Sequence, residues 1–125
     1  MLRRKHIMIV DPSPIFRRQL KATIQTHETL VNVSEAENTH QANDILRKQP
    51  PDVVFLDVAL PLESGLRLIE AIKAFAEDIR IVVLTRMDPS QCQAIVAEKG
   101  ADLFLSKEYA VGLRLIDVIH EAIRR

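Results

Sequence analysis

The sequence predicts an α/β domain in which five parallel strands form one sheet with helices on both of its faces. Short apolar runs rich in valine and isoleucine alternate with segments of helical periodicity, a pattern typical of strands buried on both faces. The chain has 125 residues, which suits one domain with one core, and we expect residues 1–125 to form it. Hydrophobic residues make up 47% and charged residues 27%, a balance that favours a folded globular protein over a disordered one.

Five apolar runs are predicted to be the strands. Each run is short and is bounded by polar residues, and the second run is weaker than the other four. Because strands and helices alternate along the chain, the strands are expected to pair in parallel. The runs are Ile7–Val10, Leu30–Val33, Val53–Leu56, Ile81–Leu84 and Leu103–Leu105.

Between these runs, apolar residues recur at helical spacing and predict five helices. The first helix is expected to begin at Pro14, with Ser13 as its N-cap. Pro50 and Pro51 are expected to stop the second helix, and Gly100 is expected to end the fourth. The five apolar stripes are Phe16, Leu20 and Ile24; Ala42, Ile45 and Leu46; Leu66, Ile69, Ile72 and Ala76; Cys92, Ile95 and Val96; and Leu115, Ile116, Ile119, Ala122 and Ile123.

Composition argues against several classes of function. Lysine plus arginine and aspartate plus glutamate both number 17, so no basic excess favours nucleic-acid binding. The apolar run before Asp11 is too short to span a membrane or to direct export. Cys92 is the only cysteine, which excludes an internal disulfide and favours a reducing, cytoplasmic setting. The histidines share no metal-ligand spacing and are expected at the surface or at element edges: His6, His27, His40 and His120.

Polar side chains stand at the carboxyl ends of four predicted strands. Asp11 follows the first strand, Asp57 follows the third, Thr85 follows the fourth, and Lys107 lies just after the fifth. In parallel sheets of this kind, ligands bind beyond the carboxyl ends of the strands. Two carboxylates, a hydroxyl and an ammonium can together hold a cation and a phosphoryl group, with a carboxylate as the nucleophile.

Three segments carry a resemblance to a known family. The segments are "VVFLDVALPLESG" (residues 53–65), "IVVLT" (81–85) and "GADLFLSK" (100–107). Together, in this order and spacing, they resemble the phosphoacceptor, switch and lysine segments of bacterial two-component response-regulator receiver domains. The resemblance covers essentially the whole chain. It implies a flavodoxin-like, doubly wound five-stranded parallel sheet with strand order 2-1-3-4-5 and five helices.

The resemblance also implies a role for each site residue. Asp57 would accept a phosphoryl group from a histidine kinase, a phosphotransfer protein or a small phosphodonor. Thr85 would be the switch hydroxyl, Lys107 the phosphate-binding lysine and Phe104 the switch aromatic. Such a domain is a component of a phosphorelay rather than an enzyme. It would signal to an effector domain or protein partner, or form a phosphorylation-dependent homodimer.

The implied Mg²⁺ site is atypical. Its ligands would be Asp11, Asp57 and the backbone carbonyl of Ala59. The family normally has two acids in succession after the first strand, whereas here Pro12 stands in the second position and offers no carboxylate. Mg²⁺ requires oxygen ligands, so the cation is expected to bind weakly.

Three further residues near the site bear on its chemistry. Arg86 follows Thr85 where a small residue is usual. Its guanidinium can reach a phosphate or Asp88, can cover the pocket, or can point into solvent. In the family, hydrolysis of the aspartyl phosphate depends on the side chains at the positions of Ala59 and Met87, and neither of these side chains would position a water well.

Other readings remain open beside that of a phosphorylated receiver. The chain can be a phosphorylation-independent pseudo-receiver, used as a protein-interaction module. A flavin enzyme of flavodoxin-like fold is disfavoured, because no glycine-rich or Ser/Thr-rich phosphate loop follows the first strand. In the receiver reading, the fourth helix, fifth strand and fifth helix form the output face. The candidate contact positions on this face are Gln91, Glu98, Lys99, Arg114 and Asp117. Polar residues at these positions are equally expected if the face is simply exposed to solvent.

Overall fold

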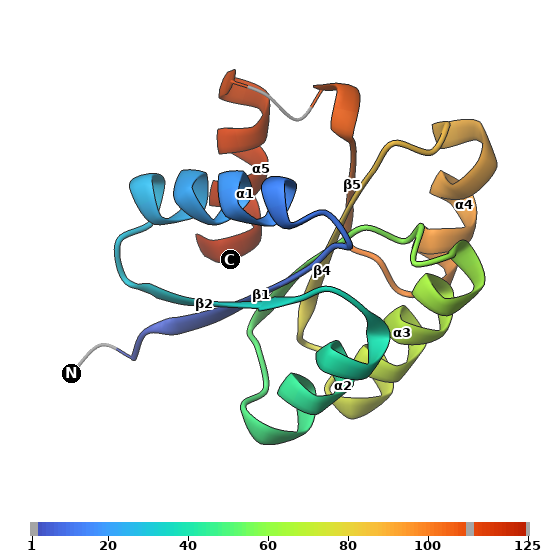
Figure 1. The fold of residues 1–125 in the computed structure, drawn as a ribbon, viewed down its shortest axis with the longest axis horizontal. Coiled ribbons are helices and arrows are strands. Elements are labelled where there is room, and N and C mark those ends of the chain that lie inside the picture. Colours follow the sequence, from blue (N-terminus) through green and yellow to red (C-terminus); the bar gives the residue numbers. More distant parts are fainter. Residues whose placement is uncertain (1–2, 110–111, 125) are drawn as a thin grey trace.

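The computed structural model describes residues 3–109 and 112–124 and shows one parallel sheet between two layers of helices (Figure 1). The strand order is β2-β1-β3-β4-β5, so the predicted fold class and the order 2-1-3-4-5 are confirmed. All neighbouring strands pair in parallel. The strands are β1 (Lys5–Val10), β2 (Val31–Ala36), β3 (Val53–Leu56), β4 (Arg80–Thr85) and β5 (Leu103–Ser106).

The helices lie on both faces of the sheet. In Figure 1, α1 and α5 cover one face, and α2, α3 and α4 cover the other. A short 3₁₀ helix, η1, follows β5 directly. The bounds are α1 (Pro14–His27), α2 (Thr39–Lys48), α3 (Leu62–Phe75), α4 (Pro89–Lys99), η1 (Lys107–Tyr109) and α5 (Gly112–Arg124).

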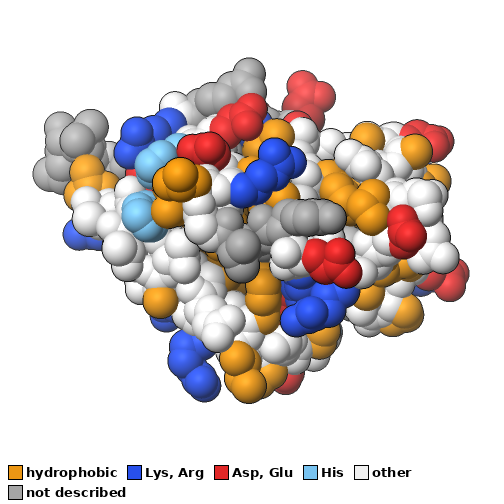
Figure 2. Space-filling model, turned by 90° about the horizontal axis from the view of Figure 1, so that it is seen from above, with side chains coloured by type: hydrophobic (Ala, Val, Ile, Leu, Met, Phe, Trp, Pro, Cys, Tyr) orange, Lys and Arg blue, Asp and Glu red, His pale blue; other side chains and the backbone are white. Residues whose placement is uncertain are grey.

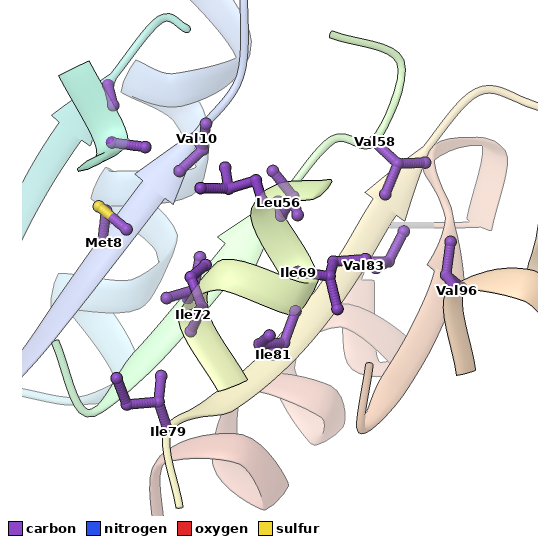
Figure 3. Packing of buried hydrophobic residues seen from close by; sticks show 14 of the residues in the cluster. Met8, Val10, Leu56, Val58, Ile69, Ile72, Ile79, Ile81, Val83 and Val96 are labelled. Atoms are coloured by element: carbon purple, nitrogen blue, oxygen red, sulfur yellow. The ribbon is translucent and has the colours of Figure 1, made fainter. Parts of the chain in front are cut away.

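The sheet divides the hydrophobic core into two parts. Successive side chains of a strand point to opposite faces, so Ile7 and Ile9 belong to one part and Met8 to the other. The α1–α5 core includes Ile7, Ile9, Leu20, Ile24, Phe55, Val82, Leu84 and Ile119. The α2–α4 core, shown in Figure 3, includes Met8, Val10, Leu56, Val58, Ile69, Ile72, Ile79, Ile81, Val83 and Val96.

The predicted helix ends agree with the structure. The Ser13 hydroxyl accepts a hydrogen bond from the Phe16 N–H at 3.1 Å, and Pro14 is the first residue of α1. Gln49 caps the end of α2, directly before Pro50. Gly100 ends α4 with φ 125°, a backbone conformation that side chains rarely adopt. Local sequence signals therefore determine these boundaries.

Strand β2 differs from its prediction. The apolar run at residues 30–33 places the strand too early, since β2 covers Val31–Ala36 and Leu30 is exposed. β2 pairs only with β1 and is an edge of the sheet. An edge strand does not require a continuous apolar run, so polar residues extend β2 beyond the predicted end.

The expectation that every histidine lies at the surface or at an edge is wrong for His6. This residue is in the interior strand β1 and is buried. Its ring Nε2 lies 2.7 Å from the hydroxyl oxygen of Ser34 on the adjacent strand β2. The position in an interior strand buries the ring, and the contact with Ser34 supplies a partner for its nitrogen.

The surface carries no membrane-spanning element in the described part of the chain. None of the helices there is both long and apolar enough to cross a bilayer. Figure 2 looks onto the molecule from above the view of Figure 1 and shows acidic, basic and apolar side chains interspersed. No single sign of charge dominates this face, as the equal numbers of acidic and basic residues in the sequence lead one to expect.

Gly65 allows α3 to pack against the segment that follows β3. It is a buried residue in the first turns of the helix. A Cβ atom at this position would lie 2.3 Å from the carbonyl oxygen of Val58. Because the obstacle is backbone rather than a flexible side chain, either α3 or the segment after β3 would have to move to accept a larger residue.

We therefore predict that Gly65→Ala destabilises the fold. The expected loss in the free energy of unfolding is about 1–3 kcal/mol, the usual range for overpacking a close contact. Urea unfolding measures it. Ser64→Ala, on the preceding residue, is the control and is expected to change stability by less than about 0.5 kcal/mol. Equal stability of Gly65→Ala and the unaltered protein would show that the contact is not tight.

Candidate functional site

The predicted site residues meet at the carboxyl edge of the sheet. Asp11 follows β1 and Asp57 follows β3, and these two strands are neighbours. Thr85 is the last residue of β4, and Lys107 comes directly after β5. The alternation of strands and helices brings all four positions to the same edge, because the strands run parallel.

The centre of the site is an ion cluster of one lysine and two aspartates. The ammonium Nζ of Lys107 lies 2.7 Å from Asp11 Oδ2 and 2.9 Å from Asp57 Oδ2. All three side chains are buried, with 6%, 2% and 8% of their surfaces exposed, respectively. Two carboxylates and one ammonium leave the cluster with one uncompensated negative charge, which favours the approach of a further cation.

Backbone groups hold the other oxygen of each carboxylate. Asp11 Oδ1 accepts a hydrogen bond from the Ser13 N–H at 2.8 Å. Asp57 Oδ1 accepts one from the Ala59 N–H at 2.9 Å. In each aspartate, one carboxylate oxygen is therefore held by a backbone N–H of the following loop, and the other contacts the Lys107 ammonium. This arrangement fixes the orientation of both carboxylates.

The backbone around the two aspartates is also tied down. The Asp57 N–H donates to the carbonyl of Val10 at 2.9 Å, which extends the pairing of β3 with β1 by one bond. The Arg17 guanidinium donates to the Asp11 carbonyl and, at 3.1 Å, to the Glu35 carboxylate. The nucleophile candidate thus stands on a rigid support.

Neither Thr85 nor Phe104 belongs to the ion cluster of Lys107, Asp11 and Asp57. Thr85 is fully buried, and its hydroxyl oxygen accepts a hydrogen bond from the Met87 N–H at 3.3 Å. A hydroxyl has one proton to donate and two lone pairs, so that of Thr85 can still donate to a phosphoryl oxygen. Phe104 pairs with Val83 across β4 and β5, and its half-buried ring packs against the α2–α4 core.

Two contacts of the site were not foreseen from the sequence. The Lys107 Nζ lies 4.1 Å from the centroid of the Phe16 ring. The contact of Arg17 with the Asp11 carbonyl is the second. From the sequence, Phe16 was predicted only to belong to the apolar stripe of α1. No local signal relates a residue of that helix to a lysine beyond the last strand.

A hollow of about 290 Å³ lies beside the site. Arg86 lines it and is exposed, and the ion pairs found among the described residues do not include Arg86. Asp88 instead caps α4, where the Ser90 N–H and hydroxyl hold the pKa of the Asp88 carboxyl below its usual range. The predicted alternative of an Arg86–Asp88 pair is therefore not formed. The hollow is lined by Arg86, Met87, Asp88, Pro89, Ser106 and Glu108.

The donor atoms of the site are suited to a hard cation, although they are few. Within residues 3–109 and 112–124, no group of three or more His, Cys, Asp or Glu side chains is arranged to hold a metal. Two carboxylates are nonetheless within the usual protein contribution to a Mg²⁺ site, which waters and phosphate oxygens complete. Lys107 occupies one oxygen of each carboxylate, and the exposed Pro12 adds no side-chain ligand. A cation at this position therefore has to compete with the lysine.

Most of the candidate output positions are exposed to solvent, whereas Cys92 is buried. Lys99 is only partly exposed and forms an ion pair with Glu70 of α3 at 3.4 Å. Cys92 lies on the buried face of α4 and packs as a core residue, and burial raises the pKa of its thiol. The remaining candidates are exposed: Gln91, Glu98, Arg114 and Asp117.

The fold and this edge of acids, hydroxyl and lysine define a receiver domain. The family profile of the response regulator receiver domain matches residues 7–120. The chain therefore belongs to the response regulator receiver family, as its sequence motifs indicated.

Similar proteins differ in length and in their described roles. A putative transcriptional regulator of Pseudomonas aeruginosa is 33% identical over 101 residues, which are 81% of this chain and 48% of that protein. The chemotaxis protein CheY of Halobacterium salinarum is 26% identical over 105 residues, 84% of this chain and 86% of that protein. The crystal structure of a response regulator from Thermotoga maritima superposes with a TM-score of 0.84 at 26% identity, covering 97% and 98% of the two chains. The chain thus spans about half the length of the Pseudomonas relative.

Proposed function

We propose that residues 1–125 form a receiver domain that accepts a phosphoryl group on Asp57. The donor would be a histidine kinase, a phosphotransfer protein or a small phosphodonor. The observation that supports this best is the buried Asp57 carboxylate, which the Ala59 N–H orients and which lies 2.9 Å from the Lys107 ammonium. A carboxylate in this setting has an oriented oxygen for attack and a cation beside the position of the incoming charge.

In the proposed reaction, an oxygen of Asp57 forms a bond to phosphorus while the bond from phosphorus to the donor breaks. The donor leaves with the electron pair of that bond. Lys107 and the Thr85 hydroxyl receive the phosphoryl oxygens. Mg²⁺, when bound at Asp11, Asp57 and the Ala59 carbonyl, would supply charge neutralisation for the transferred group. The chemistry of the domain is limited to its own phosphorylation and slow hydrolysis.

The phosphorylated state would signal through a shift between two conformations. Charge added at Asp57 would attract Thr85, the last residue of β4, and Lys107, which directly follows the adjacent strand β5. Their movement, with that of Phe104, would change the face formed by α4, β5 and α5. That face would contact an effector domain, a protein partner or a second copy of the chain.

One observation also supports the pseudo-receiver. Lys107 already bridges Asp11 and Asp57, and Pro12 removes the acid that would help a metal to displace it. A domain of this kind would bind its partner without phosphorylation. The two functions differ in whether Asp57 takes up a phosphoryl group, so one experiment separates them.

The first prediction from this proposal concerns the acceptor. Incubation with Mg²⁺ and acetyl phosphate or phosphoramidate is expected to add the mass of one phosphoryl group to the protein. Asp57→Asn should abolish the added mass, because the amide is not a nucleophile. Asp88→Asn makes the same chemical change in the neighbouring loop and preserves the α4 cap, so it should still be phosphorylated. Phosphoryl uptake by Asp57→Asn contradicts the assignment, and no uptake by the unaltered protein supports the pseudo-receiver.

The second prediction concerns the metal. Pro12→Asp should tighten Mg²⁺ binding about tenfold, or about 1.4 kcal/mol, because it adds an anionic oxygen ligand at the cation site. Titration followed by amide chemical shifts measures the dissociation constants. Pro12→Asn is the control, since it removes the proline without adding charge. Equal affinities in the Asp and Asn variants would place position 12 away from the cation.

The third prediction concerns the lifetime of the phosphoryl state. Ala59 has only a methyl group and the Met87 thioether is a weak acceptor, so neither orients the attacking water. The double variant Ala59→Asn, Met87→Glu should therefore lose its phosphoryl group faster, by ~10²-fold if it gains the lower range of general acid–base assistance. The decay is followed by intact mass in Mg²⁺ after removal of the donor.

A charge control accompanies the lifetime measurement. Gln91→Glu adds the same negative charge at an exposed position of α4 and should leave the decay unchanged. Equal decay rates in the double variant and the unaltered protein would refute the role of water positioning.

A further inference from the structure

The Lys107 ammonium has an aromatic partner in addition to its two carboxylates. Its Nζ lies 4.1 Å from the centroid of the Phe16 ring, within the range of a cation–π interaction. Phe16 belongs to α1 and is half-buried, with its ring packed against the α1–α5 core. The lysine side chain is 6% exposed, so little water competes for the ammonium at this position.

We propose that Phe16 is a positioning residue that holds the Lys107 ammonium on the two carboxylates and thereby opposes a divalent cation. The inference about the cation rests on the proposed use of Mg²⁺ at this edge. The negative face of the ring attracts the ammonium, whereas an aliphatic side chain of similar size would only pack beside it. Phe16 thus stabilises the arrangement in which Lys107 bridges the two carboxylates.

The competition follows from the atoms that are shared. Lys107 contacts Oδ2 of Asp11 and Oδ2 of Asp57, and a cation bound between these carboxylates requires the ammonium to move. Moving the ammonium away from the ring gives up the cation–π attraction, which is strongest in a site closed to water. Pro12 and Phe16 therefore act in the same direction. Pro12 provides no side-chain ligand for the metal, and Phe16 holds the competing Lys107 ammonium in place.

Stepwise fluorination of the Phe16 ring tests this proposal. Replacing Phe16 by its 4-fluoro, 3,5-difluoro and 3,4,5-trifluoro analogues weakens the negative ring face in steps and changes its shape little. The Mg²⁺ dissociation constant, measured by amide chemical shifts, should fall with each added fluorine, and Phe16→Leu should bind about 2- to 30-fold more tightly than the unaltered protein. The same series at Phe55, a fully buried ring of the same core, should show no trend.

A second measurement is independent of metal and of phosphorylation. In EDTA, the ring current of Phe16 should shift the Lys107 ε protons upfield relative to their position in Phe16→Leu.

A third experiment tests whether Phe16 acts through Lys107. In a Lys107→Gln background, fluorination at Phe16 should no longer change Mg²⁺ affinity, because the competing ammonium is absent. An effect that persists in that background would overturn the proposed pathway through Lys107.

The outcomes separate this inference from the proposed function. Any one of four results would overturn the role of Phe16. They are a flat fluorination series at Phe16, equal trends at Phe16 and Phe55, absence of Mg²⁺ binding in every variant, and absence of the ring-current shift. Failure of the unaltered protein to take up a phosphoryl group contradicts only the phosphoacceptor function. A graded series together with the ring-current shift would then still establish Phe16 as the residue that positions Lys107.

Discussion

Two carboxylates that the fold removes from water require a cation beside them, and this constraint organises the carboxyl edge of the sheet. A buried ion without compensation costs several kcal/mol, so Asp11 and Asp57 are tolerable only with Lys107 between them. The N–H groups of Ser13 and Ala59 satisfy the remaining oxygens. Two carboxylates and one ammonium still leave the cluster with a formal net charge of −1. The cluster is therefore stable enough to persist in the fold and still able to attract a further cation.

The fold was largely predictable because a strand buried on both faces needs a continuous apolar run, which is present in β1, β3 and β4 at Ile7–Val10, Val53–Leu56 and Ile81–Leu84. The edge strand β2 escapes that requirement, which is why its bounds were missed. The meeting of Asp11, Asp57 and Lys107 followed from the rule that parallel strands end at one edge. The Phe16 ring under Lys107 and the burial of His6 were not predictable, because each depends on which distant side chain completes the packing.

Pro12 is compatible with the fold because the residues around it carry the local hydrogen bonds. The backbone of Asp11 continues the pairing with β2, and its carboxylate accepts from the Ser13 N–H. Ser13 also caps α1 through its hydroxyl, and Pro14 begins the helix. A proline lacks an N–H, but position 12 is exposed and the loop turns through Ser13 instead. A proline at position 12 is thus compatible with the architecture, and its side chain offers no ligand to a cation.

The order of the strands separates the fixed part of the site from the part that can move. Asp11 and Asp57 follow β1 and β3, and each of these strands pairs with a neighbour on both sides. Lys107 follows β5, which pairs only with β4 and has four residues. Shifting an edge strand disturbs one set of backbone hydrogen bonds, whereas shifting an interior strand disturbs two. Phe104 lies in the same edge strand and is only half-buried. Under the proposed function, a change of charge at Asp57 would therefore be accommodated first where displacement costs least, at β5 and the residues attached to it.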